Sequence, residues 1–153
     1  TVLLNGFHGD TSFSCRVGME DDDLVVAARK ATEAGIKAIK PGATLGDIGF
    51  AINKSATRSG FHATPYIGGH GIGKIFHDKP FVPSHGKKGR GEVLVPGTCI
   101  TIEPLILQRE EIVESREIPG SQIEECLANG SMSAQFEHTV LITETGAEIL
   151  TKI

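Results

Sequence analysis

The chain has 153 residues, of which 39% are hydrophobic and 22% charged, and this composition predicts one globular domain rather than a disordered chain. No apolar run approaches the length that spans a bilayer, and the start of the chain lacks a signal-peptide pattern, so neither a membrane segment nor secretion is expected. The formal net charge of −4 argues against a broad binding surface for nucleic-acid phosphates, and three cysteines without close pairing fit a reducing compartment such as the cytoplasm.

The first residue is Thr1 rather than Met, and it leads directly into the strand-like run Val2-Leu3-Leu4. We therefore expect that further residues precede Thr1, and that residues 1–153 form a single domain whose N-terminal portion is missing. Any targeting segment would lie upstream, which keeps an organelle as an alternative to the cytoplasm.

A β-hairpin is predicted at the start of the chain. Asn5-Gly6 favours a type I′ turn, because both central positions of that turn need positive φ. The strand before the turn would cover residues 1–4, and the returning strand residues 11–17. Asp10 opens the returning strand, and taken alone it is equally compatible with a turn residue whose carboxylate bonds its own backbone.

Two helices are predicted next. Residues 21–40 carry apolar side chains at helical spacing, with Asp21-Asp22-Asp23 at the positive end of the helix dipole. Thr44 and Asp47 then form the pattern of a capping box at the start of a second helix. Both helices are interpreted as packing elements rather than as carriers of chemistry.

The second half of the chain is predicted to consist of strands joined by loops. Strands are expected at residues 61–67, 98–103 and 136–143, and the run 98–103 is apolar enough for a buried central strand. The segment Gly69-His70-Gly71-Ile72-Gly73 would cradle phosphate only if a helix followed directly, and residues 74–80 do not begin like a helix. Its glycines are instead interpreted as letting the backbone fold tightly around His70.

Two further stretches are polar. Lys87, Lys88 and Arg90 form a basic cluster that we interpret as a solvated loop. The segment 108–129 is acidic and weakly patterned, which is typical of a meander or a loop.

One imidazole and three carboxylates lie at or beside strand-like runs, namely His70, Asp10, Glu103 and Glu137. Carboxylate oxygens together with a neutral histidine suit Mn, Fe, Co or Zn better than they suit metals that prefer thiolates. A glutamate that ends a buried strand must be paired, protonated or bound to metal. We therefore expect these four residues to form a metal site, and we expect His138 to face away from it, because successive strand residues alternate in direction.

Four motifs carry a resemblance to a known family. They are Gly-Phe-His-Gly-Asp-Thr-Ser at 6–12, Gly-His-Gly-Ile-Gly at 69–73 with Phe76-His77, Thr-Ile-Glu-Pro at 101–104, and Ser-Ala-Gln-Phe-Glu-His-Thr-Val at 133–140. Together they resemble, in the same order, the motif series of the methionine aminopeptidases, and the similarity covers nearly the whole chain. The absence of a long insertion before Glu103 favours type I of that family over type II.

The resemblance implies the α+β pita-bread fold, in which a curved, mainly antiparallel sheet is backed by helices and holds two divalent metal ions in its bowl. It implies that Asp10 and Glu137 bridge both ions and that His70 and Glu103 complete the ligands of one. The family's remaining aspartate ligand and a further active-site histidine would lie upstream of Thr1. The second ion is therefore expected to bind more weakly in this chain, and the chain as given is expected to show weak or no peptidase activity without its upstream segment.

The implied reaction is hydrolytic removal of the N-terminal methionine from nascent polypeptides by metal-activated water. Glu103 resembles the family's proton shuttle, and His77 resembles the group that hydrogen-bonds the carbonyl oxygen or the flanking peptide. Phe76 resembles a wall residue of the methionine pocket. Gly68 and His62 depart from the family's usual residues, which changes the expected shape of the pocket but not the reaction class.

The implied partners are the N-termini of peptides and nascent chains, with the ribosome as a candidate neighbour. No specific nucleic-acid binding and no membrane partner are expected, and the oligomeric state is left open. Two alternatives also stay open. One is another pita-bread peptidase, such as an X-Pro aminopeptidase or a prolidase-like dipeptidase, and the other is a non-catalytic pita-bread binding module.

Overall fold

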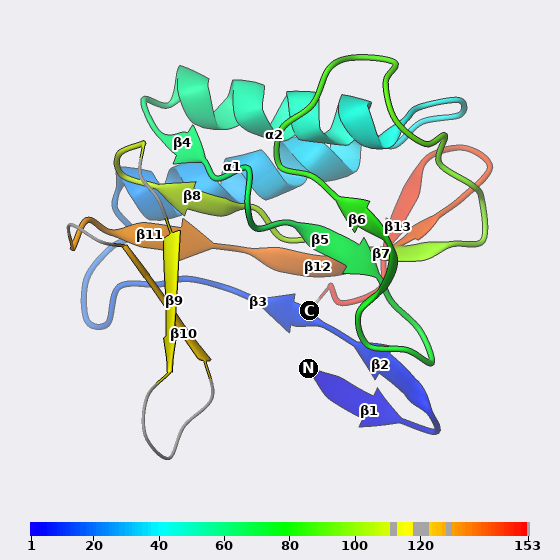
Figure 1. Cartoon of the computed structure of the whole chain (residues 1–153), viewed down its shortest axis with the longest axis horizontal. Coiled ribbons are helices and arrows are strands. Elements are labelled where there is room, and N and C mark those ends of the chain that lie inside the picture. The colour runs from blue at the N-terminus through cyan, green and yellow to red at the C-terminus, as the bar shows by residue number, and fades with distance from the viewer. Residues whose placement is uncertain (111–112, 118–122, 128–129, 153) are drawn as a thin grey trace.

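A computed structural model describes residues 1–110, 113–117, 123–127 and 130–152. Two helices, α1 (Asp23–Lys37) and α2 (Leu45–Arg58), cover one side of a layer of strands (Figure 1). The strands are β1 (Val2–Leu4), β2 (Phe7–Gly9), β3 (Thr11–Ser12), β4 (His62–Ala63), β5 (Gly69–Gly71), β6 (Asp78–Val82), β7 (Cys99–Ile102), β8 (Leu105–Leu107), β9 (Val113–Glu117), β10 (Ile123–Leu127), β11 (Ser133–Gln135), β12 (Glu137–Ile142) and β13 (Ala147–Ile149).

The main sheet is antiparallel throughout and runs in the order β13-β12-β7-β5-β6, with β3 paired to β12. A smaller antiparallel sheet, β11-β8-β4, continues the main sheet. Strand β7 of the main sheet leads into β8 through Glu103-Pro104, and β11 leads into β12 of the main sheet through Phe136. The two breaks in the ladder therefore fall beside Glu103 and Glu137. The expected α+β class and the central position of the strand at 98–103 are confirmed.

The core lies between the helices and the sheet. Helix α1 packs on β8 and β11, and α2 packs on β4 and β6. Strand β7 contributes two fully buried side chains to this layer, Ile100 and Ile102, on the side facing the helices. Gly35 allows α1 and α2 to approach closely, because a Cβ at this position would lie 2.8 Å from Cγ1 of Ile52. Burial of this apolar face is the main source of helix stability in the domain.

The predicted capping box starts α2, and α1 starts with a side-chain cap that was not predicted. Oδ1 of Asp22 accepts a hydrogen bond from the backbone N–H of Val25 at 3.1 Å. Thr44 and Asp47 form a capping box, in which the Asp47 carboxylate accepts from the Thr44 backbone at 2.9 Å. None of the helices in the described ranges is long and apolar enough to cross a membrane.

Two strand predictions were wrong. The strand that returns from the Asn5-Gly6 turn is β2, not residues 11–17, because a two-residue turn places Leu4 directly opposite Phe7. Asn5 and Gly6 do have the expected positive φ values of 51° and 81°. The strand expected at residues 61–67 is limited to β4, and the glycine-rich segment that follows supplies β5 instead.

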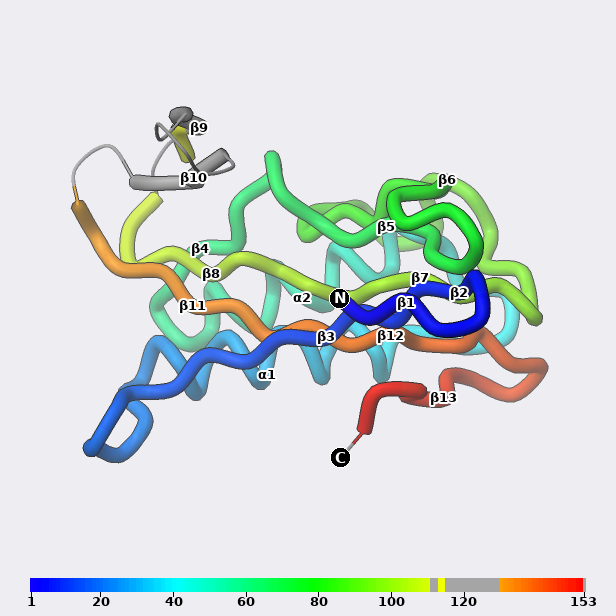
Figure 2. Tube along the Cα trace, turned by 90° about the horizontal axis from the view of Figure 1, so that it is seen from below, coloured from blue at the N-terminus to red at the C-terminus, as the bar shows by residue number. Residues whose placement is uncertain are grey.

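The acidic segment 108–129 contains an antiparallel pair, β9 and β10, which agrees with a meander. Residues 111–112, 118–122 and 128–129 of that segment lie outside the described residues. Figures 1 and 2 show the hairpin β1–β2 on the side of the main sheet opposite to the helices. The hairpin and the open face of the sheet thus enclose the region in which the candidate site lies.

Candidate metal centre

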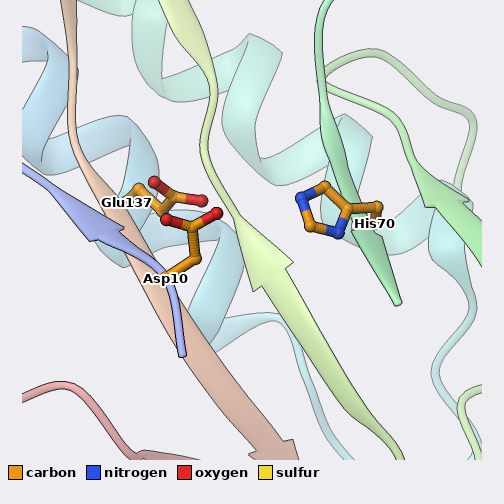
Figure 3. A group of neighbouring side chains, drawn as sticks. All are labelled: Asp10, His70 and Glu137. Carbon is orange, nitrogen blue, oxygen red and sulfur yellow. The ribbon is translucent and has the colours of Figure 1, made fainter. Parts of the chain in front are cut away.

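Three predicted ligands come together on the face of the sheet that is turned away from the helices. Asp10 lies between β2 and β3, Glu137 begins β12, and His70 is the middle residue of β5. Figure 3 shows the two carboxylates facing each other and the His70 ring approaching them from across β7. One ligand atom from each residue lies within 4.8 Å of the other two. This spacing allows all three to bind one cation.

The backbone around His70 needs glycine on both sides. A Cβ at Gly69 would collide with the carbonyl oxygen of Thr101, and one at Gly71 would collide with that of Lys79. These close approaches agree with the predicted tight folding around His70. The His70 Nδ1 lies 2.9 Å from the carbonyl oxygen of Gly71. Because a carbonyl oxygen can only accept, Nδ1 carries the proton and Nε2 is left with a lone pair for a ligand.

The fourth predicted ligand, Glu103, lies next to this group without belonging to it. Its Oε1 is 3.3 Å from Nε2 of His70. Oε1 also accepts a hydrogen bond from the Thr101 hydroxyl at 2.9 Å, and the Gln135 amide donates to the Glu103 backbone carbonyl at 2.9 Å. Glu103 is therefore held in a fixed position from which it contacts His70.

The electrostatics of the site favour protonated carboxyl groups as long as no cation is bound. Burial, which is the largest cause, and the neighbouring carboxylates of Glu103 and Asp10 together raise the pKa of Glu137 to about 8. Burial, with a smaller contribution from Asp10, raises the pKa of Glu103 to about 7. The hydrogen bond from Thr101 and the nearby His77 act in the opposite direction. Clustered carboxylates with such shifts are typical of functional sites.

The donor set fits a divalent cation. Asp10 and Glu137 are only 8% and 6% exposed. Within the described part of the chain, Oε1 of Glu137 is buried without a hydrogen-bond partner, which is costly unless another group satisfies it. A cation held by oxygens and one imidazole would satisfy that oxygen and neutralise the clustered carboxylates. Such hard donors suit Mn, Fe, Co or Zn.

The predicted substrate residues border the cluster. The ring of His77 lies with its centroid 4.4 Å from that of His70 in an edge-on arrangement. Phe76 stacks on His77 at 4.0 Å and contacts the edge of His70 at 5.7 Å. The structure therefore brings Phe76 and His77 next to the ligands. His138 points elsewhere, as expected, and its Nδ1 lies 3.0 Å from the Thr151 hydroxyl.

Sequence reasoning overlooked several residues that position the site. The Thr139 hydroxyl accepts from the Asp10 backbone N–H at 2.9 Å and donates to the Asp10 carbonyl at 2.8 Å. His8 donates its backbone N–H to the carbonyl of Gly73 at 2.9 Å and stacks on Phe76 at 5.4 Å. For the threonine, the sequence did contain a signal: it lies in an otherwise apolar buried strand. A buried hydroxyl needs hydrogen-bond partners, so such a threonine indicates polar groups nearby.

Thr101 shows this signal clearly, and its removal has a measurable consequence. The fully buried hydroxyl accepts from the backbone N–H of His70 at 2.9 Å and donates to Glu103. Thr101→Val keeps the shape of the side chain but leaves the backbone N–H of His70 without this partner. We therefore expect the free energy of unfolding, measured in urea, to be about 1 to 3 kcal/mol lower than in the unchanged protein. Thr57→Val, at an exposed position of α2, is the matched control. Equal stability of Thr101→Val and the unchanged protein would show that these bonds contribute nothing.

Comparison with known proteins agrees with the geometry. The sequence profile of metallopeptidase family M24 matches residues 1–144. Methionine aminopeptidase A of Synechocystis sp. is 41% identical over 154 aligned residues, covering 99% of this chain and 60% of that protein. The crystal structure of methionine aminopeptidase from Rickettsia prowazekii superposes with a TM-score of 0.90 at 37% identity, covering 98% of this chain and 61% of that one.

A prolidase from Pyrococcus furiosus is less similar, with a TM-score of 0.72 and 26% identity over 97% of this chain and 38% of that one. The chain thus spans about 60% of the length of the methionine aminopeptidases described above. These likenesses confirm the predicted pita-bread fold and the resemblance to methionine aminopeptidases. Since the profile match extends over far more than half of the residues, the chain belongs to metallopeptidase family M24.

Proposed function

We propose that the protein is a metal-dependent aminopeptidase that removes the initiator methionine from nascent polypeptides. The observation that carries the proposal is the buried group of Asp10, His70 and Glu137, whose ligand atoms lie within 4.8 Å of one another. The similarity to methionine aminopeptidases supports the choice of substrate. The proposal places the reaction where new chains are made, in the cytoplasm or in an organelle, with the ribosome as a candidate neighbour.

The residues that would hold metal follow from the cluster. Asp10 and Glu137 face each other and would each offer carboxylate oxygens to two divalent ions. His70, through its Nε2 lone pair, and Glu103 would complete the ligands of one of them. Cobalt, manganese, iron and zinc all accept this donor set, and cellular supply selects among them. A bound divalent cation lowers the pKa of water, and this supplies a nucleophile near neutral pH.

Glu103 is the proposed general base and acid. A carboxylate beside the reacting groups can accept a proton and return it within one reaction. The Thr101 hydroxyl and the Gln135 amide keep it beside His70. It would take a proton from the attacking water and pass it to the departing amine of the second residue.

His77 and Phe76 are the proposed substrate residues. A ring N–H of His77 would donate to the carbonyl oxygen of the scissile bond and stabilise the negative charge that develops there. Phe76 stacks on His77 and presents an apolar face beside the cluster, which suits contact with a methionine side chain.

A comparison of substrates tests the proposal. With Mn²⁺ or Co²⁺ added, the protein should release methionine from Met-Ala peptides and should leave Ala-Pro peptides uncleaved. Faster cleavage of the Ala-Pro peptides would favour an X-Pro aminopeptidase or a prolidase-like enzyme. No cleavage of either, in a protein that binds the metal, would favour a non-catalytic pita-bread binding module.

A further inference from the structure

A basic groove lies on the helical side of the molecule, away from the metal centre. Its volume is about 750 Å³, and it is formed by the end of α1, by the face of α2 that is not buried and by the loop that carries Lys88. In Figure 1 both helices lie on the opposite side of the sheet from the hairpin β1–β2, which borders the region of the metal centre. A ligand in the basic groove would therefore leave the metal centre open.

The groove concentrates positive charge in a protein whose net charge is −4. Its lining includes five cationic side chains, which are Lys37, Lys40, Lys54, Arg58 and Lys88. Its one carboxylate, Asp47, is engaged in the capping box of α2 and also accepts from the backbone N–H of Gly89 at 3.1 Å. Of the basic cluster that we expected to be a solvated loop, Lys88 thus lines the groove.

Most of these cations form no ion pair with the part of the chain that the structure describes. Lys37 lies 3.7 Å from Glu33, whereas the other four form no ion pair among the residues that the structure describes. Two of the four lie over an aromatic ring, since Nζ of Lys88 is 5.0 Å and Nζ of Lys54 5.7 Å from the centroid of Phe50. The groove therefore offers exposed cations next to a half-buried ring.

We propose that this groove binds single-stranded RNA through its phosphate backbone, without sequence preference. Single-stranded nucleic acids are held by grooves that combine cations for the phosphates with aromatic side chains on which bases stack. Phe50 and its two lysines supply that combination. The choice of RNA over DNA rests on the proposed function, since nascent chains are made next to RNA.

The test is the binding of a fluorescein-labelled oligouridine of about 20 nucleotides, followed by fluorescence anisotropy in salt titrations. If all five cations contact phosphates, the slope of log K against log salt is expected near −3.5, and affinity should fall about a hundredfold between about 50 and 200 mM salt. Unlabelled oligodeoxythymidine and poly-glutamate serve as competitors in the same assay.

The decisive variant is Lys54→Glu/Lys88→Glu. These lysines lie outside the last turns of the helices, so their reversal does not remove charges that complement a helix dipole. We expect RNA binding to weaken about tenfold or more and the salt slope to become shallower by about 1.4. The matched control is Lys79→Glu/Lys152→Glu, which makes the same change of charge at exposed positions outside the groove.

Three results would overturn the proposal. They are no RNA binding at low salt, equal weakening in the two double variants, or displacement of RNA by poly-glutamate as readily as by unlabelled RNA. More effective displacement by oligodeoxythymidine than by oligouridine would contradict the choice of RNA. Peptidase activity does not enter the assay, so failure of the groove and failure of the proposed function remain distinguishable.

Discussion

Glu103→Gln is expected to reduce methionine release about a thousandfold or more, because the amide cannot accept and return a proton during hydrolysis. The substitution changes almost no volume. The amide oxygen can still accept the hydrogen bond that the Thr101 hydroxyl gives to Oε1 of Glu103 at 2.9 Å. The variant should therefore stay folded. Turnover is measured with a Met-Ala peptide at saturating Mn²⁺, together with the melting temperature.

The matched control is Glu33→Gln, which makes the same chemical change on an exposed side chain of α1. This control should keep full activity. Full activity of Glu103→Gln would remove Glu103 from the proposed mechanism. A large loss of melting temperature in that variant alone would mean that Glu103 acts mainly in stability.

The second large effect concerns the pH dependence of stability in the protein stripped of metal. The pKa values of Glu137 and Glu103 are raised to about 8 and about 7, whereas glutamate in an unfolded chain has a pKa of 4.5. Between these values the folded state holds protons that the unfolded state has released. The stabilisation that these two protonated carboxyl groups contribute is therefore fully present below about pH 4.5, and it is lost as the pH rises through about 7 to 8.

We expect the free energy of unfolding in urea, measured in EDTA, to fall by about 2 to 4 kcal/mol between about pH 5 and pH 8. Glu137→Gln cannot ionise, so its loss of stability over this range should be clearly smaller. Saturating Mn²⁺ should stabilise the unchanged protein most at about pH 8, where a cation replaces the protons that the carboxyl groups release. Identical pH profiles for the unchanged protein and Glu137→Gln would contradict the buried, clustered position of this carboxyl group.

Local sequence chemistry predicted the helices and the turn well. The capping box of Thr44 and Asp47 and the positive φ values at Asn5 and Gly6 involve residues within a few positions of one another. Such features depend on backbone geometry that the sequence states directly. The strand predicted at residues 61–67 failed because strand length depends on partners elsewhere in the chain. The ladder between this segment and β8 comprises the two pairs of His62 and Ala63.

The convergence of the site residues followed from the family resemblance rather than from periodicity. Asp10 and Glu137 are 127 positions apart, and only the pairing of β3 with β12 brings them together. The bonds from the backbone N–H groups of His70 and Asp10 to the hydroxyls of Thr101 and Thr139 were not predicted, because they join distant parts of the chain. Long-range contacts of this kind become visible only once the order and register of the strands are known.

The most direct test is a calorimetric titration of the metal-free protein with Mn²⁺, in parallel with Asp10→Asn and with the control Asp23→Asn at an exposed position of α1. The account predicts that the unchanged protein and the control bind Mn²⁺ with equal affinity, and that Asp10→Asn binds it at least about tenfold more weakly. Absence of Mn²⁺ binding to the unchanged protein, or equal affinity in Asp10→Asn, would contradict a metal site at Asp10, His70 and Glu137.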